Sequence, residues 1–318
     1  MTSFSTTAVP RPANSTGIGM VMMAAALWAT VGVAVQITPE AGRIPEMVLA
    51  AARTGIAGPM LLAVWGLGLG GRVAELCRLS PGPLVVFAMA STVFQIFLFR
   101  CFAELGVTAA VFLTVCLPPV LAWTWSVLRG RGGLSGQSAL ALALALGGMA
   151  LVSLGGRDGA APGNIAFQGL VSGVLASIAF VAMSFAAAAL SRRSRPILVA
   201  GAGLTLSAGI LAGLALALGE FRLDGTLSDI TGSGPILLVL YLGLLPTALA
   251  YLCYCTGMAR CRTPVVGLVA SMIEPLLAAL LAALLLGEQV FATMTFGCAL
   301  LMAAMVLLWR SERAEGAP

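Results

Sequence analysis

The sequence has no lysine and no histidine, and only 9% of its 318 residues are charged. Soluble domains are about one-quarter charged, so a water-soluble protein of this length could not hide an apolar fraction of 60%. Without histidine, the chain lacks the commonest metal ligand and the commonest acid–base group near neutral pH. We therefore expect a membrane protein with no metal site, no cofactor and no catalytic residues.

The placement of the cysteines and arginines also indicates a membrane protein. The seven cysteines form no C-x-x-C motif and lie mostly in apolar runs, where cysteine is a small packing residue. All 17 basic residues are arginines, and they are spread over short loops. This distribution is typical of membrane topology signals, so we expect no nucleic-acid partner despite the isoelectric point near 9.0.

Long apolar runs dominate the chain. A helix needs roughly 20 apolar residues to cross a hydrocarbon core about 30 Å thick, and its backbone groups must be paired within the segment. The sequence predicts an all-α, polytopic membrane protein with ten transmembrane helices, at 17–37, 47–68, 83–103, 106–127, 136–155, 165–190, 197–218, 235–258, 264–286 and 290–309.

The arginines orient these helices. With the N-terminus in the cytoplasm, twelve arginines lie inside and four outside, and Arg53 falls within a span. Cytoplasmic loops are enriched in basic residues, so we expect both termini to be cytoplasmic. Acidic residues have the opposite bias, because Glu104, Glu220 and most of the others fall outside.

One helix pattern occurs twice, 157 residues apart: Gly106–Arg131 matches Thr263–Glu288, with Pro118 on Pro275 and Gly130 on Gly287. Two halves of five spans each must lie antiparallel in the bilayer, which explains why one copy ends in arginine and the other in glutamate. Inverted repeats are typical of secondary transporters, with the substrate between the halves. The expected units are an N-terminal tail (1–16), two five-helix repeats (17–155 and 164–309) and a C-terminal tail (310–318).

Glu274 lies near the middle of the ninth predicted span. A carboxylate there costs about 2.5–3.5 kcal/mol on insertion scales, so such a group normally faces the bundle interior. Pro275 removes one helical hydrogen bond and is expected to kink the helix and free the carbonyl of Ser271. Glu274 is therefore a candidate for binding a substrate amine, a proton or both. The alternative is a structural carboxyl that locks helices together.

The first repeat keeps a proline at Pro118, where a second kink is expected, and a hydroxyl at Thr114, but it has no acid. Arg53, in the second span, has two interpretations. Its side chain either reaches back to the outer surface or pairs with an acid or a substrate carboxylate.

Aromatic and amide side chains at mid-depth are further candidates, because a buried Trp, Tyr or Gln needs a polar partner. They are Trp28, Gln95, Trp123, Tyr251 and Tyr254. The pairs Gly169/Gly173 and Gly209/Gly213 have the spacing that permits close helix contact.

Several of these segments resemble the EamA family of the drug/metabolite transporter superfamily. They are Ala26-Leu27-Trp28, Ala52-Arg53, Tyr251 through Arg260, Glu274-Pro275 and Leu286-Gly287-Glu288. The first repeat departs from the family pattern, since it ends in Arg129-Gly130-Arg131. The resemblance implies a bacterial cytoplasmic-membrane carrier that exports amino acids, other metabolites or toxic compounds through a cavity that opens alternately to each side. It adds Trp28, Gln95, Thr114, Tyr251, Ser271 and Glu274 as cavity-lining residues.

Three classes of function were compared. An alternating-access carrier of a small molecule, with protons as one coupling option, fits the repeats and the single mid-depth acid. An intramembrane enzyme needs converging catalytic groups, and a channel needs rings of polar groups, neither of which the sequence supplies. We expect a monomer or homodimer in a lipid bilayer that carries a small zwitterion or an apolar cation.

Overall fold

The computed structural model describes residues 15–38, 44–129, 163–221, 233–261, 264–286 and 292–315, with isolated positions between 140 and 151. All regular elements in these ranges are helices. The first group is α1 (Ser15–Trp28), α2 (Thr30–Gln36), α3 (Glu46–Ala63), η2 (Val64–Gly68), α4 (Val73–Cys77), α5 (Pro81–Leu105) and α6 (Val107–Leu128). The second group is α8 (Gly163–Ser191), α9 (Pro196–Ala217), α11 (Ser233–Leu242), η3 (Gly243–Leu249), α12 (Ala250–Arg260), α13 (Pro264–Ala270), α14 (Ile273–Leu281), η4 (Ala282–Leu286) and α15 (Ala292–Glu315).

The described helices make this a multi-pass membrane protein. Six helical stretches are long and apolar enough to cross a bilayer: Thr16–Gln36, Glu46–Gly68, Pro81–Leu105, Phe167–Ser191, Pro196–Ala217 and Gly234–Arg260. Three shorter apolar helices cover Ala109–Trp125, Pro264–Ala278 and Thr295–Ala304. The fifth predicted span, 136–155, and the repeat ends at Gly130 and Gly287 lie outside the fully described ranges.

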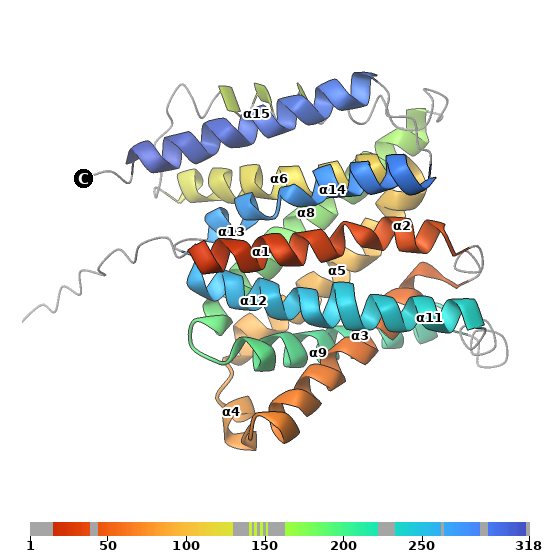
Figure 1. Ribbon diagram of the computed structural model, residues 1–318, viewed down its shortest axis with the longest axis vertical. Helices are drawn as coiled ribbons and strands as arrows, with labels where there is room; N and C mark the ends of the chain where they lie inside the picture. Colours follow the sequence, from red (N-terminus) through yellow and green to blue (C-terminus); the bar gives the residue numbers. More distant parts are fainter. Residues whose placement is uncertain are drawn as a thin grey trace, which may run out of the picture.

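The closest helix packing joins one half of the chain to the other. Helix α1 packs along α12, α3 along α9, and α5 along α8. Helix α1 begins and α15 ends on the same side of the bundle, and α1 and α8 run in opposite directions (Figure 1). The two halves therefore interlock and do not form separate lobes.

Glycine lets some of these helices approach closely. A Cβ at Gly58 of α3 would lie 2.5 Å from the backbone nitrogen of Thr205 in α9. Gly169 and Gly173 of α8 face Leu105 and Leu113 in the same way, as their spacing predicts. Gly209 and Gly213 have nothing within 4 Å, so this second pair makes no close helix contact among the described residues.

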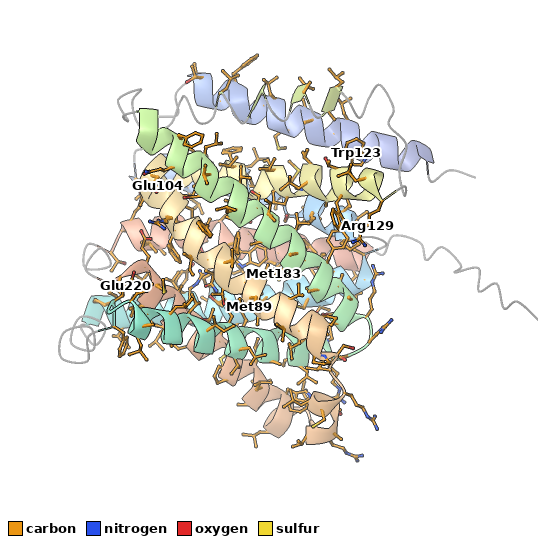
Figure 2. The ribbon with its side chains drawn as sticks, turned by 180° about the vertical axis from the view of Figure 1, so that it is seen from behind. Met89, Glu104, Trp123, Arg129, Met183 and Glu220 are labelled. Carbon is orange, nitrogen blue, oxygen red and sulfur yellow. The ribbon has the colours of Figure 1, made fainter. Side chains whose placement is uncertain are left out.

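Charged residues mark the two ends of the bundle. Glu104 and Glu220 lie at one end and Arg129 lies at the other (Figure 2). The only ion pair among the described residues, between Arg195 and Glu75 at 3.6 Å, is partly exposed.

Candidate functional site

The first predicted span is interrupted beside Trp28. Helix α1 ends at this residue and α2 begins at Thr30, whose hydroxyl donates to the carbonyl of Leu27 at 2.7 Å. The indole of Trp28 packs at 5.4 Å from the ring of Tyr251 and at 6.0 Å from that of Phe180. Residues from three helices therefore meet beside the turn that joins α1 to α2.

The ninth predicted span is also interrupted, at Ser271 and Met272 between α13 and α14. The sequence predicted a free carbonyl at Ser271. The structure contradicts this prediction, because that carbonyl accepts a hydrogen bond from the backbone N–H of Glu274 at 3.0 Å. Pro275 cannot donate to that carbonyl, and the N–H one residue earlier takes its place. The proline therefore sits in the first turn of a new helix, and Glu274 lies beside it at the break.

The matching proline of the first half behaves differently. Helix α6 continues from Val107 to Leu128 through Pro118 and Pro119 without a break. The hydroxyl of Thr114 donates to the carbonyl of Ala110 at 2.8 Å, one turn earlier in the same helix. The two prolines that align in sequence thus do not have the same effect on their helices.

Arg53 is held inside the bundle. Its side chain is 4% exposed, so the predicted extension to the outer surface is wrong. Its Nε donates to Oε1 of Gln95 at 2.9 Å, and its guanidinium carbon lies 5.4 Å from the ring centre of Phe99. The Gln95 amide nitrogen in turn donates to the Ser91 hydroxyl at 3.4 Å. A planar guanidinium fixed at one nitrogen can still donate through its other nitrogens.

These residues surround one enclosed cavity of about 30 Å³. Its walls come from both halves of the chain and combine polar with aromatic and aliphatic side chains. They are Trp28, Val31, Arg53, Phe94, Leu98, Phe102, Val111, Thr114, Val115, Phe180, Tyr251 and Glu274. A space of this size holds roughly one water molecule, so a metabolite enters only when the helices move apart.

The two charged residues of the cavity are not paired with each other. Arg53 and Glu274 form no ion pair within 4.0 Å, and the Glu274 carboxylate accepts no hydrogen bond from any described residue. Ionised groups away from water are normally paired or hydrogen-bonded. A guanidinium group and a carboxyl group therefore face the same small space without an ion pair between them.

On the side of the cavity nearer to Arg129, aromatic rings close the bundle. The Tyr254 hydroxyl lies 2.6 Å from that of Ser184, and its ring lies 5.1 Å from that of Trp28. The Tyr251 hydroxyl donates to the sulfur of Met183 at 3.7 Å, deep in the bundle centre (Figure 2). This layer separates the cavity from one end of the molecule.

Towards the other end, a hydrogen bond joins two helices beside the cavity. The Tyr241 hydroxyl donates to Oγ1 of Thr30 at 2.6 Å and links α11 to α2. A groove of about 550 Å³ lies beside this bond, between α2, α11 and η4. This hydrogen bond is therefore one of the contacts that hold the helices together between the cavity and this end.

The predicted site residues fall into two groups. Trp28, Arg53, Thr114, Tyr251 and Glu274 line the cavity, and Gln95 contacts it through Arg53. The buried hydroxyl of Ser271 is not part of the wall and donates to the carbonyl of Leu268 at 2.7 Å. Sequence reasoning missed Phe94, Phe102 and Phe180, because an apolar side chain in an apolar span carries no distinguishing signal. No cluster of three or more potential metal ligands occurs in the described part of the chain.

Comparison with known proteins relates this architecture to transporters. Residues 167–310 match the EamA-like transporter family. The chain is 26% identical over 301 residues to a Bacillus subtilis (strain 168) protein named "Uncharacterized transporter YwfM", with 93% of this chain and 94% of the relative covered. A solved structure described only as "Crystal structure of protein" has a likeness in fold, with a TM-score of 0.69, 21% identity and coverage of 96% of this chain and 100% of the other.

Proposed function

Because residues 167–310 match the EamA-like transporter family, we propose that the chain is a secondary transporter that exports a small zwitterionic metabolite, such as an amino acid, by alternating access. The observation that carries this proposal is the placement of Arg53 and Glu274 on the wall of one cavity without an ion pair between them. A zwitterion supplies the two missing partners, its carboxylate to Arg53 and its ammonium to Glu274.

The packing of the helices supports two inverted five-helix repeats. When each predicted span is exchanged for its counterpart in the other half, the contact of α1 with α12 becomes that of α8 with α5. The exchange leaves the contact of α3 with α9 unchanged, because these two helices are each other's counterparts. The opposite directions of α1 and α8 fit this relation (Figure 1). Ten spans related in this way bring the cavity to the repeat interface, where transporters hold their substrates.

The topology we propose puts both termini in the cytoplasm and the protein in the cytoplasmic membrane of a bacterium. The shared side of the two terminal helices supports it, as does the separation of Glu104 and Glu220 from Arg129 (Figures 1 and 2). In this orientation the Tyr254–Ser184 layer faces the cytoplasm, and the Tyr241–Thr30 bond faces the outside.

Glu274 is the residue we propose for proton coupling. It lies at mid-depth, and no described residue neutralises it. A carboxyl in such a place exchanges a proton against a cationic group of the substrate, because the site favours one positive charge at a time. Uniport and solute exchange are the alternatives that do not require this step.

An efflux carrier for apolar cations is the second candidate. The aromatic walls formed by Trp28, Phe94 and Phe180 favour it, because cations bind to the faces of aromatic rings. The two candidates differ in their need for Arg53, which a zwitterion requires and an apolar cation does not.

Flux in proteoliposomes tests the proposal. Uptake of labelled neutral amino acids is expected to saturate with concentration, to exceed uptake of glutamate, and to fall when Arg53 is replaced by Gln. A flux that rises linearly without saturation would indicate a pore. A flux of the amino acid that is insensitive to the pH gradient and is retained by Glu274→Gln would remove the coupling proposal. In cells, tolerance to a panel of amino acids and toxic solutes with and without the protein identifies the solute.

A further inference from the structure

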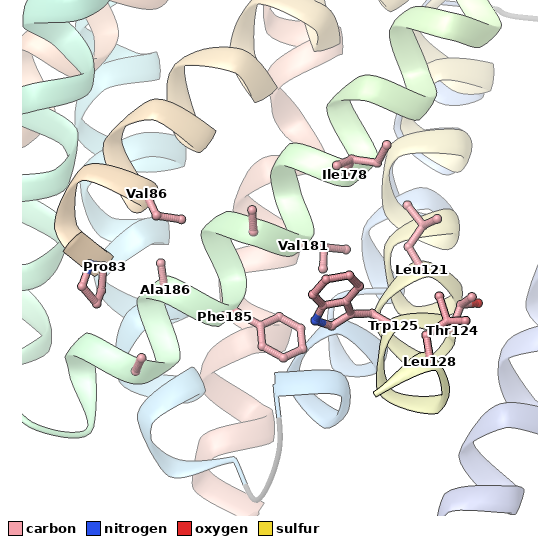
Figure 3. A pocket seen from close by; sticks show the side chains of 12 residues that line it. Pro83, Val86, Leu121, Thr124, Trp125, Leu128, Ile178, Val181, Phe185 and Ala186 are labelled. Atoms are coloured by element: carbon pink, nitrogen blue, oxygen red, sulfur yellow. The ribbon is translucent and has the colours of Figure 1, made fainter. Parts of the chain in front are cut away.

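A second hollow, of about 840 Å³, opens on the outer surface of the bundle between α5, α6 and α8 (Figure 3). We call it the α6–α8 groove. Its lining is almost entirely apolar and consists of Pro83, Val86, Leu121, Thr124, Trp125, Leu128, Ile178, Val181, Ala182, Phe185, Ala186 and Ala189. Ligand sites have volumes of roughly 300–1,000 Å³, so the groove is large enough for a ligand of its own.

The groove is separate from the central cavity. Ile178 and Ala182 line the groove, whereas Phe180 of the same helix lines the cavity. Residues two positions apart on a helix are about 200° apart around its axis, so α8 stands between the two spaces. The groove therefore opens to the surroundings of the bundle and not to the substrate site.

The dimensions of the groove correspond to one leaflet of a bilayer. Its lining advances eleven residues along α8, from Ile178 to Ala189, which is about 16 Å at the helical rise. This is close to half of a hydrocarbon core about 30 Å thick. The groove reaches the end of α6 at Leu128, where a headgroup region is expected to begin.

A positively charged side chain, that of Arg129, lies at that end of the groove. The guanidinium carbon of the exposed Arg129 lies 4.4 Å from the ring centre of Trp125, which is itself a lining residue. Arg129 has no ion-pair partner among the described residues. Tryptophan and arginine at a helix end are the residues that proteins place at lipid headgroups, and guanidinium groups bind phosphate.

We propose that the α6–α8 groove binds an acyl chain of an anionic phospholipid, with Arg129 contacting the lipid phosphate. The lipid is favoured over other occupants because the apolar hollow, its one-leaflet length and the exposed Arg129 at its end match the parts of such a molecule. The assignment to the cytoplasmic leaflet rests on the proposed topology, and the site itself does not depend on which solute is carried.

Native mass spectrometry of the full-length, delipidated protein tests this site. Phosphatidylglycerol and phosphatidylcholine with the same acyl chains are added, and retained lipid is counted. We expect about fivefold more retained phosphatidylglycerol than phosphatidylcholine, because one arginine near an anionic lipid surface contributes about 1 kcal/mol. Arg129→Gln is expected to remove this preference, and Ala189→Phe, which fills the groove from an exposed position, is expected to reduce both lipids. Arg100→Gln, at an exposed cation near the opposite end of α5 from Pro83, and Ala217→Phe, on the exposed surface of α9, are the matched controls.

Equal retention of the two lipids, or retention unchanged by Arg129→Gln and Ala189→Phe, overturns the proposal. A lipid-free species of twice the mass that Ala189→Phe abolishes also overturns it, because a second copy then fills the groove. If a variant does not fold, bromine-labelled phosphatidylglycerol replaces the mass measurement. It is expected to quench more tryptophan fluorescence in the wild type than in Trp125→Phe, and equal quenching contradicts the site.

Discussion

At the scale of single residues, the geometry around Arg53 leads to a sharp expectation for substrate affinity. Arg53→Gln removes a charge-assisted hydrogen bond, worth about 1.5–3 kcal/mol, so the half-saturation concentration for a neutral amino acid should rise roughly 10- to 150-fold. Arg53→Lys keeps the charge but lacks the forked donor geometry. Its half-saturation concentration should therefore lie between those of the wild type and Arg53→Gln. Proteoliposome uptake measures this, and an unchanged half-saturation concentration in Arg53→Gln would exclude a role for Arg53 in binding.

Gln95 should act through Arg53 and not on the solute directly. Gln95→Leu removes the acceptor that holds Nε at 2.9 Å, so transport should weaken by roughly tenfold, the loss expected from about 1.4 kcal/mol. In the Arg53→Gln background the same change should have little further effect, because coupled residues are not additive. Additive losses of transport in the double variant would show that Gln95 does not act through Arg53.

The sequence singled out polar residues of this region but not its apolar ones. Glu274, Arg53 and Gln95 stand out because a polar group in an apolar span needs a partner, and the structure brings all three to one region. Phe94 and Phe180 could not be singled out, because most positions of these helices are equally apolar. Ser271 was predicted to line the cavity with its hydroxyl, but in the structure that hydroxyl donates to the backbone carbonyl of Leu268.

At the scale of helices, the close contact of α3 with α9 predicts where glycine is required. Gly58→Ala would put a methyl group 2.5 Å from the Thr205 backbone, and overpacking of this kind typically costs about 1–3 kcal/mol. Gly209→Ala meets nothing within 4 Å and should leave stability unchanged or slightly higher. Melting temperatures in detergent compare the two, and equal values would contradict this packing.

The link between α11 and α2 predicts an effect on opening. Tyr241→Phe removes one hydrogen bond, worth about 0.5–1.5 kcal/mol. Alkylation of a cysteine placed at the cavity residue Val31 should therefore become roughly two- to tenfold faster from outside. Tyr254→Phe removes the bond to Ser184 at the opposite side of the cavity and serves as the control, since it should not accelerate labelling from outside. The same variants without the added cysteine give the background.

Hydrophobicity predicted the positions of the described helices, but it did not predict where helices are interrupted. Proline was expected to kink both matched helices, yet α6 continues through Pro118 while the other helix breaks at Ser271 and Met272. The turn beside Trp28 could not be predicted either, because residue 29 is an alanine and not a proline or glycine. Such interruptions depend on the packing of neighbouring helices, which no local pattern records.

At the scale of the whole molecule, the two chain ends should be reached from one side of the membrane. Single cysteines at Ser3 and at Ala317, combined with a membrane-impermeant maleimide, should react in inverted vesicles and not in right-side-out vesicles. Labelling of the two positions from opposite sides would mean an odd number of spans and would contradict the inverted-repeat arrangement.

The size of the central cavity has a consequence for the cell that produces the protein. Among the described residues, a space of about 30 Å³ beside a layer of aromatic rings leaves little room for a file of water through which protons or sodium could drain. Idle copies can therefore accumulate in the membrane without dissipating its ion gradients, and a cell can keep the protein ready before its cargo ever becomes abundant.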